Sequence, residues 1–116
     1  MRKLDDINIG IYEKALPKNI SWEERIKLVK ECGYDFMEIS IDETDERLAR
    51  LEYSKEEIKQ IRDYLLDADV RIPSMCFSGH RRFPMGSMSQ ETRDKAMELM
   101  EKAIVFADRL GIRTIQ

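Results

Sequence analysis

The only histidine of the sequence stands beside two arginines at His80, Arg81 and Arg82, in a segment over 79–87 that we predict to be a loop. A guanidinium stays charged at any working pH and offers paired donors to a phosphate or carboxylate. The cluster therefore predicts an oxyanion contact through Arg81 or Arg82, with His80 beside it. In the alternative interpretation the arginines form ion pairs with acidic residues of the charged run that follows the predicted strand over 34–42: Asp42, Glu43 or Asp45.

Two further side chains belong to segments that alternate between apolar and polar residues. Glu38 stands on the polar side of such a segment, and a carboxylate there is costly unless a polar cavity or an ion pair receives it. We predict that Glu38 faces a binding site or pairs with an arginine. Tyr12 ends another alternating segment, where its phenol could hydrogen-bond a substrate hydroxyl or close the end of the fold.

Other common kinds of site leave no pattern in the sequence. Neither a dinucleotide-binding glycine motif nor a phosphate-binding P-loop motif occurs. One histidine and scattered carboxylates do not have the spacing of a divalent-metal site, so we expect this chain to bind no metal. Cys32 and Cys76 lack metal-ligand and C-x-x-C spacing, and we predict buried free thiols.

The elements that must position these residues follow from hydrophobic periodicity. Strict alternation predicts strands over 7–13, 34–42, 70–78 and 112–116, while apolar stripes predict helices over 22–32, from 54 to about 68, and over 90–110. Capping boxes begin the first two helices at Ser21 and Ser54, and Gly33 and Gly111 follow helix ends. In the last helix we assign the buried stripe to Met97, Met100, Ile104 and Ala107. The charged run over 42–47 is predicted to be a solvated loop.

Repeated strand–helix units indicate a parallel sheet with right-handed crossovers. Each predicted strand has one apolar and one polar face, which favours a barrel wall over an open sheet. A complete (βα)8 TIM barrel takes about 250 residues. We therefore expect 116 residues to form a single partial domain of about three and a half βα units, ending in strand 4. Its active-site end would carry the residues at the ends of the predicted strands and just after them, namely 12–14, 38–42 and 78–83.

Composition excludes several classes of partner. Lysine and arginine number 20 against 23 aspartate and glutamate, a formal net charge of -3, so no broad positive field attracts nucleic acid. No apolar run has the length of a membrane helix or a signal peptide, which predicts a cytoplasmic location. An unclosed barrel wall has free strand edges, so we expect the chain to associate with a copy of itself or with the rest of a barrel.

Four long segments carry a resemblance to a known family. They are GIYEKALP at 10–17, MEISIDETDERLARLEYS at 37–54, RIPSMCFSGHRRFPMGS at 71–87 and FADRLGIRTIQ at 106–116. The chain resembles the amino-terminal part of the L-ribulose-5-phosphate 3-epimerases, also called L-xylulose-5-phosphate 3-epimerases and formerly hexulose-6-phosphate isomerases. The resemblance implies a xylose-isomerase-like barrel that interconverts the two phosphorylated ketopentoses in L-ascorbate and pentose catabolism.

What the resemblance implies for the site is limited to substrate binding. In that family a divalent metal stabilises an enediolate while two glutamates transfer the C3 proton, and those residues belong to later strands. The present segment is therefore expected to hold no catalytic residue and no metal, and to be inactive alone. Tyr12, Glu38, His80, Arg81 and Arg82 are the expected substrate-binding residues. The alternative is a non-catalytic module that binds an anion or a partner protein through residues 80–82. A nuclease on the same barrel is disfavoured by the acidic balance.

Overall fold

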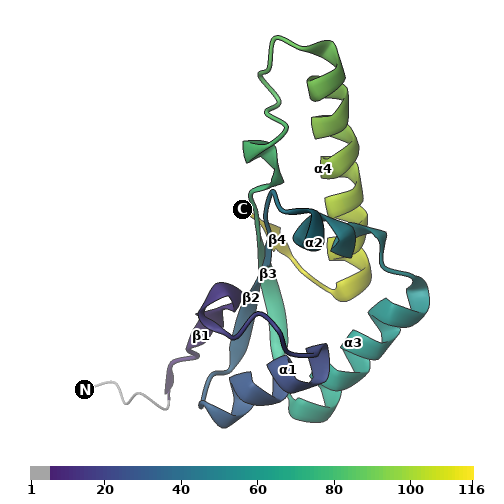
Figure 1. The fold of residues 1–116 in the computed structure, drawn as a ribbon. Helices are drawn as coiled ribbons and strands as arrows, with labels where there is room; N and C mark the ends of the chain where they lie inside the picture. The colour runs from purple at the N-terminus through teal and green to yellow at the C-terminus, as the bar shows by residue number, and fades with distance from the viewer. Residues whose placement is uncertain (1–5) are drawn as a thin grey trace.

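The computed structural model describes residues 6–116 and contains one sheet of four parallel strands. The strands are β1 (Gly10–Tyr12), β2 (Phe36–Ile41), β3 (Arg71–Phe77) and β4 (Thr114–Ile115), and they are neighbours in chain order. The crossovers contain α1 (Trp22–Glu31), α3 (Lys55–Ala68) and α4 (Gln90–Leu110). Figure 1 shows these helices gathered on one side of the sheet. This arrangement confirms the prediction of three complete βα units and a fourth strand.

Short turns of helix follow each of the first three strands. The 3-10 turn η2 (Glu13–Ala15) follows β1, and η4 (Gly79–Arg81) follows β3. After β2 the chain forms α2 (Asp45–Leu48) and then η3 (Ala49–Glu52) before α3 begins. Since the strands are parallel, all three insertions lie at the same end of the sheet.

Side-chain capping fixes where the helices start. Ser21 and Ser54 each accept from the backbone N–H three residues on, and Glu24 and Glu57 reach back in the two predicted capping boxes. Ser89 caps α4 in the same way, without a reciprocal glutamate. Gly111 ends α4 with φ +82°, in the left-handed region that favours glycine. The local helix signals in the sequence are therefore confirmed.

The sheet has an apolar face covered by the helices and a polar face. Met37, Ile39 and Ile41 of β2 and Met75 of β3 are fully buried against residues such as Ile26 of α1 and Ile61 of α3. The alternate positions on the other face carry Gly10, Tyr12, Glu38, Ser40, Ser74 and Cys76. This is the polar inner face that the alternation predicted.

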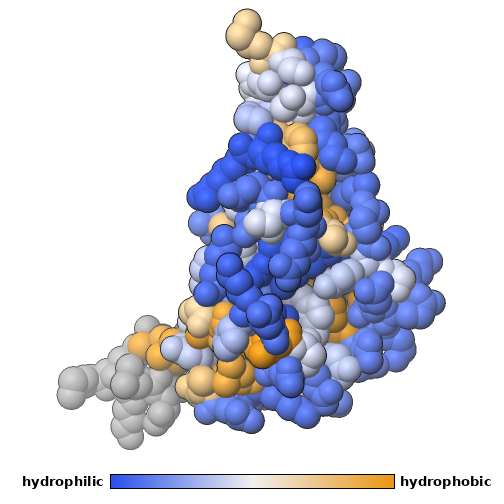
Figure 2. Space-filling view, viewed as in Figure 1, coloured by the Kyte–Doolittle hydropathy of each residue, from blue (hydrophilic) through white to orange (hydrophobic). Residues whose placement is uncertain are grey.

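The first strand is shorter than predicted. β1 begins at Gly10, which pairs with Phe36, the first residue of β2, so residues 6–9 have no strand to pair with. Ile7 and Ile9 are exposed, and Figure 2 shows apolar surface low on the molecule, in the region where β1 lies in Figure 1. Outside the strand ladder, the backbone N–H of Ile9 donates to the side chain of Asp35, and the backbone N–H of Asp35 donates to the carbonyl oxygen of Ile9.

The buried stripe predicted for α4 was correct at Ala107, and Met100 packs partly buried against the core, but Met97 and Ile104 were assigned to the wrong face. Met97 and Ile104 are 53% and 54% exposed, while the buried residues are Ala96, Leu99, Ala103, Phe106, Ala107 and Leu110. The two stripes are one residue apart, and both satisfy helical spacing. The small side chains of Ala96 and Ala103 let α4 lie close to the sheet, which favours the face that has fewer large residues.

The cysteines are both free, as predicted, but neither is fully buried. Cys32 is exposed because it lies at the end of α1, and Cys76 is half-buried on the polar face of β3. In the described part of the chain, no helix combines the length and the hydropathy that crossing a membrane requires.

Close packing at the start of β1 gives a test of the sheet. A Cβ atom on Gly10 would lie 2.0 Å from the Phe36 ring, whereas one on Gly86 would meet nothing within 4 Å. We expect Gly10→Ala to lower the free energy of unfolding by about 1–3 kcal/mol, because the ring must be displaced. Gly86→Ala is the matched control, and urea denaturation of both variants measures the difference. Equal stabilities would contradict this packing.

Candidate functional site

Tyr12, at the end of β1, contacts the polar face of the neighbouring strand. Its hydroxyl donates to Ser40 Oγ at 3.1 Å, and Ser40 pairs in register with Cys76 of β3. Burial raises the pKa of Tyr12 above its ordinary value, and Cys76 adds to the rise while the bond with Ser40 opposes it. The phenol is therefore neutral at physiological pH and acts as a hydrogen-bond donor.

Glu38 lies beside Tyr12 in register and is half-buried. Its Oε2 accepts from Ser74 Oγ at 2.7 Å, across the β2–β3 pair. The alternative of an ion pair with an arginine is not seen among residues 6–116. A carboxylate held by one hydroxyl keeps lone pairs for further donors, such as those of a polyhydroxyl ligand.

The three residues at 80–82 point to different neighbours. The ring of His80 packs edge-on against Phe77, with centroids 4.9 Å apart, and its Nε2 lies 3.2 Å from the carbonyl oxygen of Ala96 in α4. Arg82 pairs with Asp45 at 2.5 Å, as one alternative predicted. Arg81 is exposed, and its side chain makes no hydrogen bond or ion pair within the described residues. Of the three, Arg81 has the guanidinium that remains available to a ligand.

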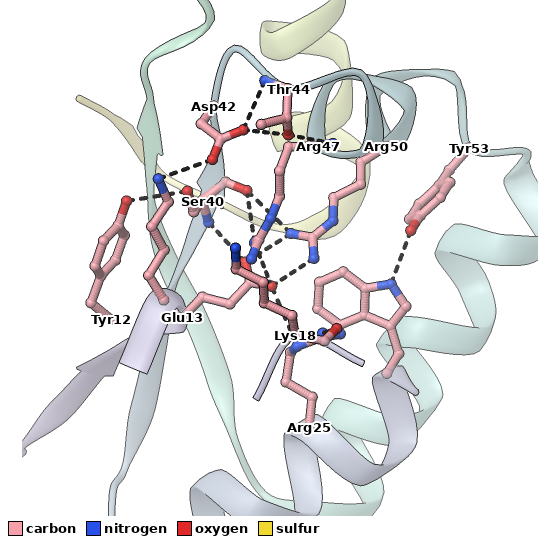
Figure 3. A network of polar contacts seen from close by, with 12 residues as sticks. Tyr12, Glu13, Lys18, Arg25, Ser40, Asp42, Thr44, Arg47, Arg50 and Tyr53 are labelled. Carbon is pink, nitrogen blue, oxygen red and sulfur yellow. Dashed lines mark hydrogen bonds and ion pairs between the residues drawn. The ribbon is translucent and has the colours of Figure 1, made fainter. Parts of the chain in front are cut away.

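The most highly connected polar group at this end of the sheet is Glu13, which the sequence placed at the active-site end but did not single out as a site residue. Glu13 is 1% exposed and follows directly after β1. Arg50 binds it through both guanidinium Nη atoms, at 2.7 Å to Oε1 and 2.6 Å to Oε2. Arg47 lies 2.8 Å and Arg25 3.4 Å from Oε2. Figure 3 shows the three arginines converging on this carboxylate.

The backbone of β2 is part of the same network. Ser40 N donates to Glu13 Oε1 at 2.9 Å, and Arg50 Nη1 donates back to the Ser40 carbonyl oxygen at 3.1 Å. Burial raises the pKa of Glu13, but hydrogen bonds and charge from Arg50 outweigh it, so the net effect lowers that pKa. Glu13 therefore stays ionised and joins the ends of β1 and β2 to the helical segments.

An aromatic ring completes the cluster. The guanidinium carbons of Arg25 and Arg50 lie 4.9 and 4.6 Å from the centroid of the Trp22 ring. The indole N–H of Trp22 donates to Tyr53 Oη at 3.1 Å. Planar cations stacked on an indole are held in one orientation. Trp22 thereby holds the guanidiniums of Arg25 and Arg50 in place beside Glu13.

The prediction of a solvated loop over 42–47 was wrong. Thr44 caps α2 by accepting from Arg47 N, and Asp42 and Arg47 are both buried. Asp42 accepts from Thr44 Oγ1 at 2.6 Å and from Lys14 Nζ at 2.9 Å. The available signal in the sequence was Thr44, which stands three residues before Arg47 and six before Arg50. A threonine at this position caps a helix, and the spacing of three residues between the arginines places both on one face.

The described part of the chain brings together no metal-ligand set. Among residues 6–116, no group of three or more His, Cys, Asp or Glu side chains could hold a metal ion. The polar groups at the strand ends are instead the Tyr12 hydroxyl, the Glu38 carboxylate and the guanidiniums. Figure 2 shows the hydrophilic surface that covers the upper ends of the strands.

The fold and the sequence agree on the wider relationship. A sequence profile described as "Xylose isomerase-like TIM barrel" matches residues 26–116. The chain belongs to this family. It is 55% identical over 108 residues to the putative L-ribulose-5-phosphate 3-epimerase SgbU of Haemophilus influenzae, covering 93% of the chain and 38% of that protein. It is 52% identical over 110 residues to the L-ribulose-5-phosphate 3-epimerase UlaE of Shigella boydii serotype 18, covering 95% and 39%.

Solved structures of this barrel family show the same arrangement of strands and helices. A D-psicose 3-epimerase crystallised in the presence of D-fructose superimposes with a TM-score of 0.76 at 20% identity, over 94% of this chain and 36% of that one. A D-psicose 3-epimerase from Clostridium cellulolyticum H10 with D-tagatose gives 0.75 at 16% identity, with the same coverage. The expected resemblance and the partial barrel are thus confirmed, and the chain spans under two-fifths of the length of these relatives.

The salt bridge and hydrogen bonds of Asp42 predict a pH dependence for this barrel segment. Burial raises the pKa of Asp42, but the bonds from Thr44 and Lys14 outweigh it and lower that pKa from 3.8 to about 2. Because the folded-state pKa is the lower one, ionised Asp42 stabilises the fold above pH 3.8, and this contribution is lost as the pH falls toward 2. As the pH falls from above 3.8 toward 2, we expect the free energy of unfolding of the unmodified chain to fall by about 2 kcal/mol more than that of Asp42→Asn.

Urea denaturation from pH 5 to pH 2 measures this difference. Asp63→Asn is the control, because Asp63 forms only an exposed pair with Lys59. If the free energy of unfolding fell equally with pH in the unmodified chain and in Asp42→Asn, the lowered pKa assigned to Asp42 would be contradicted.

Proposed function

We propose that this chain is part of a sugar-phosphate 3-epimerase that interconverts L-ribulose 5-phosphate and L-xylulose 5-phosphate in L-ascorbate and pentose catabolism. The observation that carries the proposal is the 52–55% identity, over nearly the whole chain, to proteins that bear the name L-ribulose-5-phosphate 3-epimerase. The likeness to D-psicose 3-epimerases supports the fold alone.

The proposed reaction removes and returns a proton at C3, which the C2 ketone makes acidic. Within residues 6–116 we assign substrate binding and no proton transfer. Tyr12, whose phenol proton is donated to Ser40, accepts from one sugar hydroxyl through its oxygen, and Glu38 accepts from another. We further propose His80 as a wall of the pocket and Arg81 as the phosphate contact, since Arg82 is paired with Asp45.

The residues that act at C3 are proposed to belong to other parts of the complete protein. The chain covers 38% of its SgbU relative, so a complete barrel has room for further strand ends. A divalent metal ion that stabilises the enediolate is part of the proposal for that complete protein. The residues described here do not make up its site, so we assign it no ligands in this segment.

We propose that residues 1–116 form a single partial domain, the amino-terminal part of a barrel that ends in strand 4, and that they are inactive alone. The inner face of the sheet exposes part of Tyr12 and half-buried polar groups, which favours association with a second copy or with the rest of the barrel. A phosphorylated ketopentose carries charge and does not cross a membrane unaided, which supports a cytoplasmic location.

Solvent isotope uptake tests the proposed reaction. We expect the complete protein, incubated with L-xylulose 5-phosphate and a divalent metal in D2O, to form L-ribulose 5-phosphate and to place deuterium at C3, as seen by proton NMR. The 116-residue chain under the same conditions is expected to do neither. Turnover without deuterium at C3, or no turnover by the complete protein, would exclude the proposed reaction.

The phosphate contact has a test of its own. Arg81→Ala in the complete protein should raise KM for the phosphorylated substrate about tenfold, with little change in kcat, because one charge-assisted contact is lost. The unphosphorylated ketopentose should react with unchanged kinetics. Arg71→Ala, at the exposed start of β3, is the control. An equal effect of Arg81→Ala on both substrates would remove Arg81 from the phosphate site.

A further inference from the structure

A cavity of about 210 Å³ adjoins the Glu13 cluster. Its walls come from the β1–α1 connection, α1 and the α2–η3 segment, and none comes from the polar inner face that carries Glu38. Five cationic side chains line it: Lys14, Lys18, Arg25, Arg47 and Arg50. Figure 3 shows the three arginines and Lys18 around the same space.

The buried charges beside this cavity do not balance. Arg25, Arg47 and Arg50 are 5%, 8% and 7% exposed and share one carboxylate, Glu13. The other buried carboxylate, Asp42, lies on the wall and pairs with Lys14. The five cations that line the cavity therefore face three carboxylates, Glu13, Asp42 and the exposed Glu46, which leaves an excess of two positive charges within the described residues. Unbalanced buried charge is costly, and a bound anion would offset it.

An unsatisfied hydrogen-bond donor on Arg25 also favours a bound anion. The Nε of Arg25 is buried and has no hydrogen-bond acceptor among the described residues. Its nearest acidic atom is Glu13 Oε2 at 3.4 Å, which already accepts from Arg50 and pairs with Arg47. An unmet donor on a buried guanidinium costs free energy until an acceptor reaches it.

We propose that this cavity binds a tetrahedral phosphate-class oxyanion. Guanidiniums present paired donors that match phosphate oxygens, and a dianion carries the two charges that the cluster leaves unbalanced. A water molecule takes about 30 Å³ of the liquid, so the cavity is large enough for a phosphate group. Inorganic phosphate and the phosphate of a sugar phosphate share this chemistry. This site is separate from the contact proposed for Arg81.

Isothermal titration of the 116-residue chain with inorganic phosphate, in a low-salt buffer without other polyvalent anions, tests the proposal. Lys18 and Glu46 line the cavity, are exposed, and form no side-chain hydrogen bond or ion pair within the described residues. Lys18→Gln should weaken phosphate binding about tenfold, because a charged donor is lost. Glu46→Gln should tighten it roughly two- to fivefold, because a repelling charge is removed.

Lys27→Gln is the matched control, because Lys27 lies on α1 outside this cavity and pairs with Glu23. It should leave the affinity unchanged. Titrations with L-xylulose 5-phosphate and L-xylulose distinguish the sources of the phosphate. If the sugar phosphate competes with inorganic phosphate, either form occupies the cavity. If the two do not compete, the cavity takes only the free ion. These titrations need no turnover, so they stand apart from the epimerase assay. No phosphate binding, or equal affinities in all three variants, would overturn the proposal.

Discussion

The carboxylate of Glu13 joins the ends of β1 and β2 to α1 and to the contiguous α2–η3 segment. It accepts from the backbone of β2 and meets guanidiniums from α1, α2 and η3, while its own backbone directly follows β1. A buried ion cluster of this kind is weak evidence of added stability, because desolvation offsets much of the attraction. Its effect lies in specificity, since any other arrangement of these segments would leave a charge buried without a partner. The β1 and β2 ends are thereby held in one geometry.

This constraint places the residues proposed to meet substrate. Tyr12 precedes Glu13, and Ser40, which accepts from Tyr12, is bound to Glu13 through its backbone N–H. Arg47 anchors α2, and α2 in turn carries Asp45, the partner of Arg82. Three of the strand-end segments are therefore linked through one network. The polar face of the sheet and the Glu13 cluster lie at the same strand ends, so the proposed substrate contacts and the proposed anion site share a single end of the fold.

Local signals in the sequence predicted most of the fold. Capping boxes, strand alternation and the order of units depend on neighbouring residues and were confirmed at Ser21, Ser54 and Met37 to Ile41. Two failures concern choices that depend on tertiary packing: the face that α4 buries, and the length of β1. The position of Glu13 at the strand end was predicted, but its buried ion cluster was not, because its arginine partners lie 12 to 37 residues away and a single glutamate after a strand is indistinguishable in the sequence from an exposed one.

The central claim is that Glu13 remains an ionised, buried carboxylate at the centre of three arginines. The most direct measurement is an NMR titration of its side-chain carboxyl carbon between pH 6 and pH 2 in the folded chain. The structure predicts a midpoint clearly below the ordinary value of 4.5, because Arg50, Ser40 and Arg47 stabilise the charged form. A midpoint at or above 4.5 would mean that burial outweighs the arginines, and it would contradict the account.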